Sequence, residues 1–200
     1  CTDYCDAFGK QATTLEASGD IKGSRVFRLL AAVASYWPAY DSTEAPYRPA
    51  VILGDRRSAI PEDLTAADLA TLADILGEIL DPEFRARVAD VLWICPPKNY
   101  KAAQTAVDAY IASSRVLDAG KFWLPSLDRL QRARQIGAQI GRFKSFHQKA
   151  IQAIEEAIVR HEATENSLRC ARLMHMLLAD GVGDPKRYAQ LAETLALRME

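Results

Sequence analysis

The sequence lacks most of the patterns that mark a membrane protein or a small secreted domain. Only four of its 200 residues are cysteines, too few and too scattered for a disulfide framework: Cys1, Cys5, Cys95 and Cys170. It has no run of about 18 apolar residues, and no basic segment followed by an apolar one at its start. We therefore expect reduced thiols, a cytoplasmic location and no membrane association.

The sequence also lacks the motifs of metal, nucleotide and covalent chemistry. It contains no His-Glu-x-x-His, Cys-x-x-Cys or Gly-x-Ser-x-Gly motif, and Gly181-Val182-Gly183 is not followed by the residues of a phosphate-binding loop. The three histidines, His147, His161 and His175, are spaced too far apart to share a helical turn. We expect no metal, no cofactor and no catalytic residue.

Charge is balanced over the whole chain, with a formal net charge of -1, but not along it. Between Asp55 and Asp90 the sequence contains nine acidic residues and four basic residues. Between Asp128 and Lys149 it contains six basic residues and one acidic residue. With one histidine, these basic residues form a candidate basic face: Arg129, Arg132, Arg134, Arg142, Lys144, His147 and Lys149. Such a split is typical of solvated helix faces, of a surface for a protein partner, or of a strip that binds RNA.

What the sequence does contain is a series of helices separated by Pro, Gly and Asp. Apolar residues recur at helical spacing, and no run shows the alternation of a strand. The spacing predicts helices over roughly these ranges: 3–18, 24–35, 65–80, 82–94, 99–117, 124–140, 143–162, 167–180 and 184–199. Ser24, Thr65 with Asp68, and Asp81 before Pro82 are the predicted starts of three of them. A proline-bearing segment over about 37–63 is predicted to be irregular and is a possible boundary within one domain of residues 1–200.

Short turns between these helices favour antiparallel hairpins. We predict an all-α fold, either a repeat-like, right-handed α-solenoid similar to tetratricopeptide proteins or an irregular helical bundle, since no strict repeat length is present. In its core we place Trp93, Tyr110 and Trp123, and we expect Arg85 and Asp90 to form an ion pair on the helix of Trp93.

One short motif suggests catalysis. Arg142 and His147 are five residues apart, a spacing that resembles the Arg-x4-6-His motif of higher eukaryote and prokaryote nucleotide-binding ribonucleases. The residue after the arginine is usually polar in that family, whereas here it is Phe143. The simpler interpretation is a helix start with a solvated arginine and histidine.

A wider resemblance depends on five segments: Phe27-Arg28-Leu29-Leu30, residues 45–49, residues 56–64, residues 85–93 and Tyr100-Lys101-Ala102-Ala103. Over roughly residues 20–145 the chain resembles the N-terminal helical region of a group of large uncharacterised bacterial proteins. In some of those proteins a second helical domain bears an Arg-Asn-x-x-x-His element similar to the ribonuclease motif, but this chain has no Arg-Asn pair. The resemblance implies the non-catalytic front part of a larger protein. A chain that begins with Cys1 is also compatible with a mature lipoprotein.

We therefore predict a non-catalytic helical scaffold that binds another protein or another domain of its own chain. An RNA-binding or ribonuclease-associated module, as in bacterial defence, is the alternative, and would show strong salt dependence and loss on charge reversal at Arg132 and Arg142. A helical enzyme would require a pocket with converging polar groups.

Overall fold

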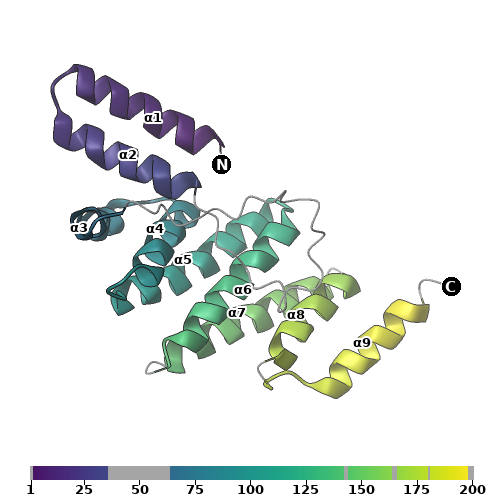
Figure 1. The fold of residues 1–200 in the computed structure, drawn as a ribbon. Helices are drawn as coiled ribbons and strands as arrows, with labels where there is room; N and C mark the ends of the chain where they lie inside the picture. The colour runs from purple at the N-terminus through teal and green to yellow at the C-terminus, as the bar shows by residue number, and fades with distance from the viewer. Residues whose placement is uncertain (1, 36–63, 142–143, 164–165, 180, 198–200) are drawn as a thin grey trace. The chain divides into compact units, whose positions relative to one another are not determined.

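The computed structural model describes residues 2–35, 64–141, 144–163, 166–179 and 181–197 (Figure 1). The described residues are all-helical, without a strand, as predicted. The helices are α1 (Thr2–Ala17), α2 (Ile21–Ser35), α3 (Ala66–Ile75) with the 3-10 turn η1 (Leu76–Glu78), α4 (Pro82–Ile94), α5 (Tyr100–Ala119), α6 (Trp123–Gln139), α7 (Lys144–Ala163), α8 (Ser167–Ala179) and α9 (Pro185–Leu197). They form two compact units, Cys1–Ala109 and Tyr110–Glu200, and the boundary falls within α5. No helix in these described ranges is both long enough and apolar enough to cross a bilayer.

The first unit begins with the antiparallel hairpin of α1 and α2 (Figure 1). Gly19 provides the positive φ, 85°, of the turn, a conformation that residues with a Cβ rarely adopt. Asp20 then caps α2, because its Oδ1 accepts a hydrogen bond from the Gly23 amide at 2.9 Å. The predicted start at Ser24 is wrong, since this residue lies inside α2 and is buried. Sequence spacing favoured the serine, but an aspartate four residues earlier satisfies the first free amides of the helix.

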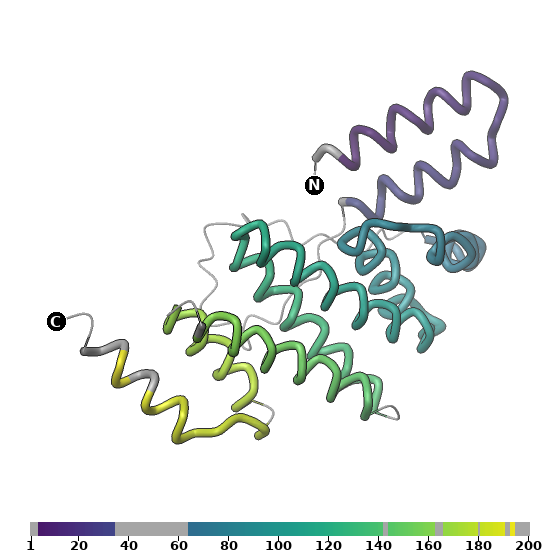
Figure 2. Tube along the Cα trace, turned by 180° about the vertical axis from the view of Figure 1, so that it is seen from behind, coloured from purple at the N-terminus to yellow at the C-terminus, as the bar shows by residue number. Residues whose placement is uncertain are grey.

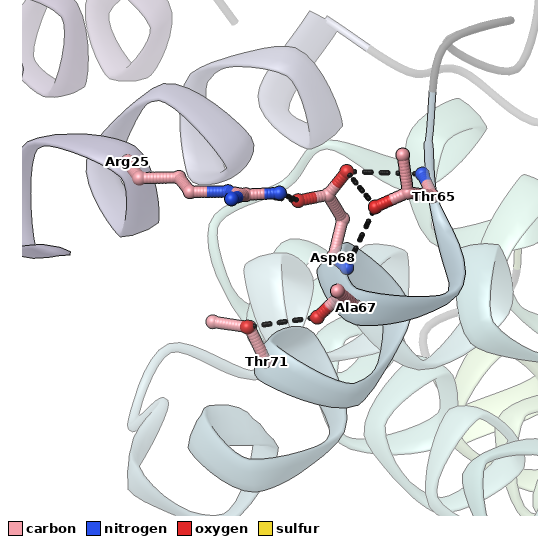
Figure 3. A network of polar contacts seen from close by, with 5 residues as sticks. All are labelled: Arg25, Thr65, Ala67, Asp68 and Thr71. Atoms are coloured by element: carbon pink, nitrogen blue, oxygen red, sulfur yellow. Dashed lines mark hydrogen bonds and ion pairs between the residues drawn. The ribbon is translucent and has the colours of Figure 1, made fainter.

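The start of α3 has the predicted capping box (Figure 3). Thr65 Oγ1 accepts from the Asp68 amide at 3.2 Å, and Asp68 Oδ2 accepts from the Thr65 amide at 2.9 Å. Arg25 of α2 donates to Asp68 Oδ1 through Nη2 at 2.6 Å and through Nε at 3.1 Å. Asp68 therefore both caps α3 and links it to α2. The predicted irregular segment between these two helices lies in residues 36–63, outside the described residues.

We expect replacement of Asp68 by Asn to cost about 1 kcal/mol at pH 7, the usual worth of a helix cap. Hydrogen bonds from the Thr65 hydroxyl and amide, and then from Arg25, lower the pKa of Asp68 to about 2. In the unfolded chain the pKa of an aspartate is about 4. A carboxyl whose pKa is lower in the folded chain stabilises the fold at pH values above about 4, and this contribution is lost as the pH falls toward 2. Urea unfolding at pH 7 and pH 2.5 checks this, with the exposed Asp74→Asn of α3 as control. An equal loss for Asp68→Asn at both pH values would contradict it.

Two further helix starts follow the predicted residues. Asp81 Oδ1 accepts from the Phe84 amide at 2.7 Å with Pro82 in the first turn of α4, which confirms the Asp-Pro start. Asn99 Oδ1 accepts from the Ala102 amide at 3.0 Å at the start of α5. These caps explain why two helices separated by only five residues, 95–99, remain distinct.

The core of the first unit lies among α2, α3, α4 and the start of α5. Its buried apolar side chains are Leu29, Leu30, Val33, Ala34, Leu72, Phe84, Val88, Val91, Leu92, Cys95 and Ala102. Phe8 of α1 covers it with a ring 5.1 Å from that of Phe84. The core also contains a charged residue, Arg87, which is 6 % exposed. Its guanidinium donates to the Ala34 carbonyl at the end of α2 at 3.0 Å and to Glu83 Oε1 at 2.9 Å. The guanidinium is therefore buried with its hydrogen bonds satisfied.

The second unit comprises the end of α5 and helices α6, α7, α8 and α9, in which each helix from α6 onward packs against the next (Figure 2). Ser126 of α6 donates through Oγ to the Ser114 carbonyl of α5 at 2.9 Å. Cys170 of α8 contacts the Ile158 carbonyl of α7 at 3.6 Å. α6 and α7 approach so closely at Gly137 that a Cβ there would lie 2.9 Å from the His147 Cα. These contacts position the ends of α5 and α7 and the start of α8, where the candidate site lies.

Candidate functional site

The predicted basic face is not an exposed surface. Arg129, Arg132 and Arg134 are only 3 %, 8 % and 6 % exposed. All six residues from Arg129 to Arg134 are buried, and six consecutive residues of a helix point in every direction around its axis. α6 is therefore enclosed around its circumference, and its arginines hydrogen-bond inside the fold: Arg134 donates to Gln131 at 3.3 Å, for example. The count of charges along the sequence could not show this, because it treats every arginine as solvated.

The remaining members of that face do not combine into a site. Lys144 and Lys149 are exposed on α7, and Lys149 Nζ lies 5.9 Å above the Phe146 ring. His147 is half-buried. Arg142, which the ribonuclease-like motif requires, lies outside the described residues, so this prediction stays a prediction.

The predicted core residues divide into two groups. Trp93, Asp90 and Tyr110 are buried, at 2 %, 0 % and 1 % exposure. Arg85 and Trp123 are half-buried. Within residues 64–141 the Arg85 Nε donates to the Ile79 carbonyl at 2.5 Å rather than to Asp90, so the predicted ion pair is wrong. The reason is geometric, since residues five apart on a helix lie on different faces.

A pocket with converging charged groups lies in the second unit. It has a volume of about 460 Å³ and is lined by residues from three helices: Arg115, Asp118 and Ala119 of α5, Arg160 and His161 of α7, and Arg169 of α8. Asp118 is the only acidic side chain of this lining, against three guanidiniums. Glu156, outside the lining, pairs with Arg115, with 2.8 Å between Glu156 Oε2 and Arg115 Nη2.

His161 forms the floor of the pocket with Asp118. The imidazole is 8 % exposed, and its Nε2 lies 3.2 Å from Asp118 Oδ1. Arg160 Nε lies 3.6 Å from the other carboxylate oxygen, Oδ2. Burial lowers the pKa of His161, and Arg169 and Arg160 lower it further, while Asp118 opposes them. The ring is therefore neutral at pH 7, and the arginines carry the positive charge of the pocket.

Arg169 is held differently from the other two arginines. Its guanidinium lies 5.3 Å from the centre of the Trp123 ring, and Arg172, one turn further along α8, lies 5.0 Å from the same ring. A cation above an indole is held by the ring's electron density, which leaves the N–H donors of the guanidinium unused. Among the described residues, Arg169 has no carboxylate partner.

Asn166, just before α8, keeps these groups together. The Asn166 amide donates to the His161 carbonyl at 2.9 Å, and the Asn166 side chain accepts from the Arg169 amide at 3.4 Å. One residue, Asn166, thus connects the end of α7 to the first turn of α8. Because both hydrogen bonds are local, the positions of His161 and Arg169 are coupled through the backbone.

Exposed apolar side chains adjoin every arginine of the pocket in sequence. Val116 follows Arg115, Val159 precedes Arg160, and Leu168 precedes Arg169. Their exposed fractions are 63 %, 61 % and 50 %. Phe122, at 63 %, is exposed in the turn between α5 and α6. Exposed apolar side chains on the helices that carry the arginines are a feature of surfaces that bind other proteins.

Sequence reasoning missed this site because its members come from three helices and are 54 residues apart at the extremes, Arg115 and Arg169. The local count of basic residues ended at Lys149, before Arg160, Arg169 and Arg172. A weak signal was available in the adjacent Arg160-His161 pair at the end of one helix and Arg169 in the first turn of the next. Only the fold brings Arg115 and Asp118 to the same place.

Comparison with known proteins identifies one family. A family model described as a domain of unknown function (DUF7380) matches residues 1–149. No curated protein and no solved structure matches the chain. The match includes Arg115 and Asp118 of the pocket but ends before Arg160, His161 and Arg169.

Proposed function

Because the chain belongs to this domain family of unknown function, DUF7380, which assigns no activity, we propose a function from the pocket: a helical scaffold that binds an acidic segment of a protein partner. The partner is another protein or another domain of the same polypeptide. The proposal includes a repeat-like arrangement of the helical hairpins, which suits proteins that bind extended partners.

The observation that carries the proposal is the convergence of Arg115, Arg160 and Arg169 from three helices on one pocket. Guanidinium groups present several N–H donors in a fixed plane and bind carboxylates and phosphates through paired hydrogen bonds. Negative charge on the ligand would suit Arg169, since Arg115 pairs with Glu156 at 2.8 Å and Arg160 lies 3.6 Å from Asp118. The ring of His161 beside them faces Asp118 Oδ1 through Nε2 at 3.2 Å.

The exposed aliphatic side chains favour a protein segment over a free ion or a nucleic acid. Val116, Val159 and Leu168, each next to one of these arginines in the sequence, are exposed on the same helices, and aliphatic side chains of a partner can cover such surface. Single-stranded nucleic acids instead require aromatic side chains for base stacking and a basic groove. The buried Arg129, Arg132 and Arg134 cannot form that groove.

A peptide array tests this function. Peptides with a central Asp or Glu flanked by Leu or Val should bind the full chain, whereas the same peptides with a central Lys should not. Arg160→Gln and Arg169→Gln should each weaken binding by roughly tenfold or more, because a hydrogen bond to a charged group is worth about 1.5–3 kcal/mol.

Arg28→Gln is the matched control. Arg28 is 63 % exposed and contacts Glu16, much as Arg115 is 55 % exposed and contacts Glu156, but it lies in the first unit. This variant should bind as the unmodified chain does. Equal binding of acidic and Lys peptides would contradict the proposal, as would acidic-peptide binding that Arg169→Gln leaves unchanged. An oligouridylate that displaces the acidic peptides from the arginines would instead favour RNA.

A further inference from the structure

We infer that the acidic segment bound at this pocket belongs to a second copy of the same chain and is the turn of residues 76–80, between α3 and α4. The inference rests on the proposed function and names its partner. Glu78 of one copy pairs with Arg169 of the other, and Leu80 packs beside that pair. The contact joins two different surfaces of the chain, so it links copies head to tail.

The 76–80 turn has the composition that the proposed function expects of a ligand. Its sequence is Leu-Gly-Glu-Ile-Leu, an acidic residue among aliphatic ones. Leu80 is 88 % exposed, the largest exposed fraction of any large apolar side chain in the described residues. Glu78 is exposed as well, and among the described residues no cation pairs with it. Both side chains are therefore open to a partner, because their own chain leaves them uncovered.

The other residues of the turn hold it in place. Leu76 and Ile79, on either side of Glu78, are partly buried and pack against the core of the first unit. The Ile79 carbonyl also accepts the hydrogen bond from Arg85 Nε at 2.5 Å. The turn is thus ordered before it meets a partner, which reduces the conformational entropy lost on binding.

Arg169 is the group of the pocket that can accept the carboxylate. Its guanidinium lies 5.3 Å from the centre of the Trp123 ring, and no carboxylate in the described part of the chain pairs with it. A guanidinium held by an indole can form two parallel hydrogen bonds to one carboxylate. Leu168 precedes Arg169 on α8 and is 50 % exposed, so it offers apolar surface to Leu80. The inference requires no free charge on the other two arginines of the pocket.

The two units also carry opposite net charges. Residues 1–109 contain 16 acidic and 11 basic residues, and residues 110–200 contain 10 acidic and 14 basic residues. The formal net charge is therefore −5 for the first unit and +4 for the second. Such charges attract the first unit of one copy to the second unit of another, and they oppose contact between like units. They favour a head-to-tail contact over a symmetric one.

Sedimentation velocity of the full chain from micromolar to millimolar concentrations tests the inference. We expect dimers and longer species that increase with concentration and decrease with added salt, because each head-to-tail assembly leaves one turn and one pocket free at its ends. Glu78→Gln, Leu80→Ser and Arg169→Gln should each weaken self-association by roughly tenfold. Asp6→Asn is the matched control, since Asp6 is exposed on α1 and its replacement changes the net charge of the first unit as Glu78→Gln does. This variant should associate as the unmodified chain does.

A mixture of two variants tests the head-to-tail arrangement. The Glu78→Gln chain keeps an intact pocket, and the Arg169→Gln chain keeps an intact turn. At a concentration where each variant alone is mostly monomeric, an equal mixture should form a one-to-one complex and no larger species, because only one intact contact is available. A mixture that does not associate would overturn the inference. So would self-association of either variant that equals that of the unmodified chain.

The fate of the proposed function is decided separately. If the unmodified chain were monomeric at every concentration, the second copy would be overturned as the partner. The proposed function would then still stand if the acidic peptides of the array bound and Arg169→Gln weakened them. If the chain were monomeric and no acidic peptide bound, both the inference and the proposed function would be overturned.

Discussion

Replacement of Trp93 by Ala is expected to lower the free energy of unfolding by about 3–5 kcal/mol, the range for removal of a large aromatic side chain from a core. The indole is 2 % exposed on α4, so almost all of its surface is removed from water. The Tyr100 ring packs against it at 5.3 Å in an edge-on orientation, and Ala cannot provide this contact.

Guanidinium unfolding followed by circular dichroism measures this loss. Lys98→Gln is the informative control, because the Lys98 ammonium lies 4.7 Å above the Trp93 ring at an exposed position. An exposed cation–π contact is worth about 0.5–1 kcal/mol, so the control should lose far less stability than Trp93→Ala. A loss below about 1 kcal/mol for Trp93→Ala would show that the indole is not part of the packed core.

The helices could be predicted from the sequence where a cap and an apolar periodicity agree. Thr65 with Asp68, and Asp81 with Pro82, each combine a side-chain acceptor with the residue type that follows it in a capped helix. These signals are local, and their hydrogen bonds form within three residues. Where two acceptors compete, as Asp20 and Ser24 do before α2, the sequence does not decide between them. There the observed start follows Asp20, and Ser24 is buried.

Burial of charge could not be predicted in the same way. From the sequence alone, Arg87 and Arg129 are expected to lie on the surface, because arginine is usually solvated. In the structure they are only 6 % and 3 % exposed. Arg87 has a local partner in Glu83, but it also donates to a backbone carbonyl at the end of α2, 53 residues away in sequence. Such partners depend on tertiary structure, and side-chain periodicity carries no information about them.

The candidate pocket illustrates the same limit at the level of function. Each of its arginines has an ordinary local interpretation as a solvated helix residue, and only the fold brings the three arginines to one pocket with Asp118 and His161. The sequence predicted a scaffold from the absence of catalytic motifs, whereas the structure shows a pocket lined by arginines from three helices.

The close approach of α6 to α7 leads to the second large effect, at Gly137. Replacement of a glycine by Ala in a helix interior normally stabilises it by up to about 1 kcal/mol. At Gly137, however, a Cβ would lie 2.9 Å from the His147 Cα, 3.1 Å from its amide nitrogen and 3.2 Å from the Phe146 carbonyl oxygen. All three are backbone atoms, so no side-chain rotation can relieve the clash. The two helices must separate, which typically costs 1–3 kcal/mol, and we expect a net loss of about 2 kcal/mol.

Gly9→Ala provides the matched control for this prediction. Gly9 also lies inside a helix, α1, but apart from its chain neighbours and the nearby backbone of α1, no atom lies within 4 Å of the position its Cβ would take. Its replacement by Ala should therefore stabilise the chain by about 0.5–1 kcal/mol, so the same substitution should have opposite signs at the two glycines. Urea unfolding of both variants measures the difference. Stabilisation by Gly137→Ala would mean that α6 and α7 do not meet at His147, and the placement of α7 and of His161 beside Asp118 would then have to be revised.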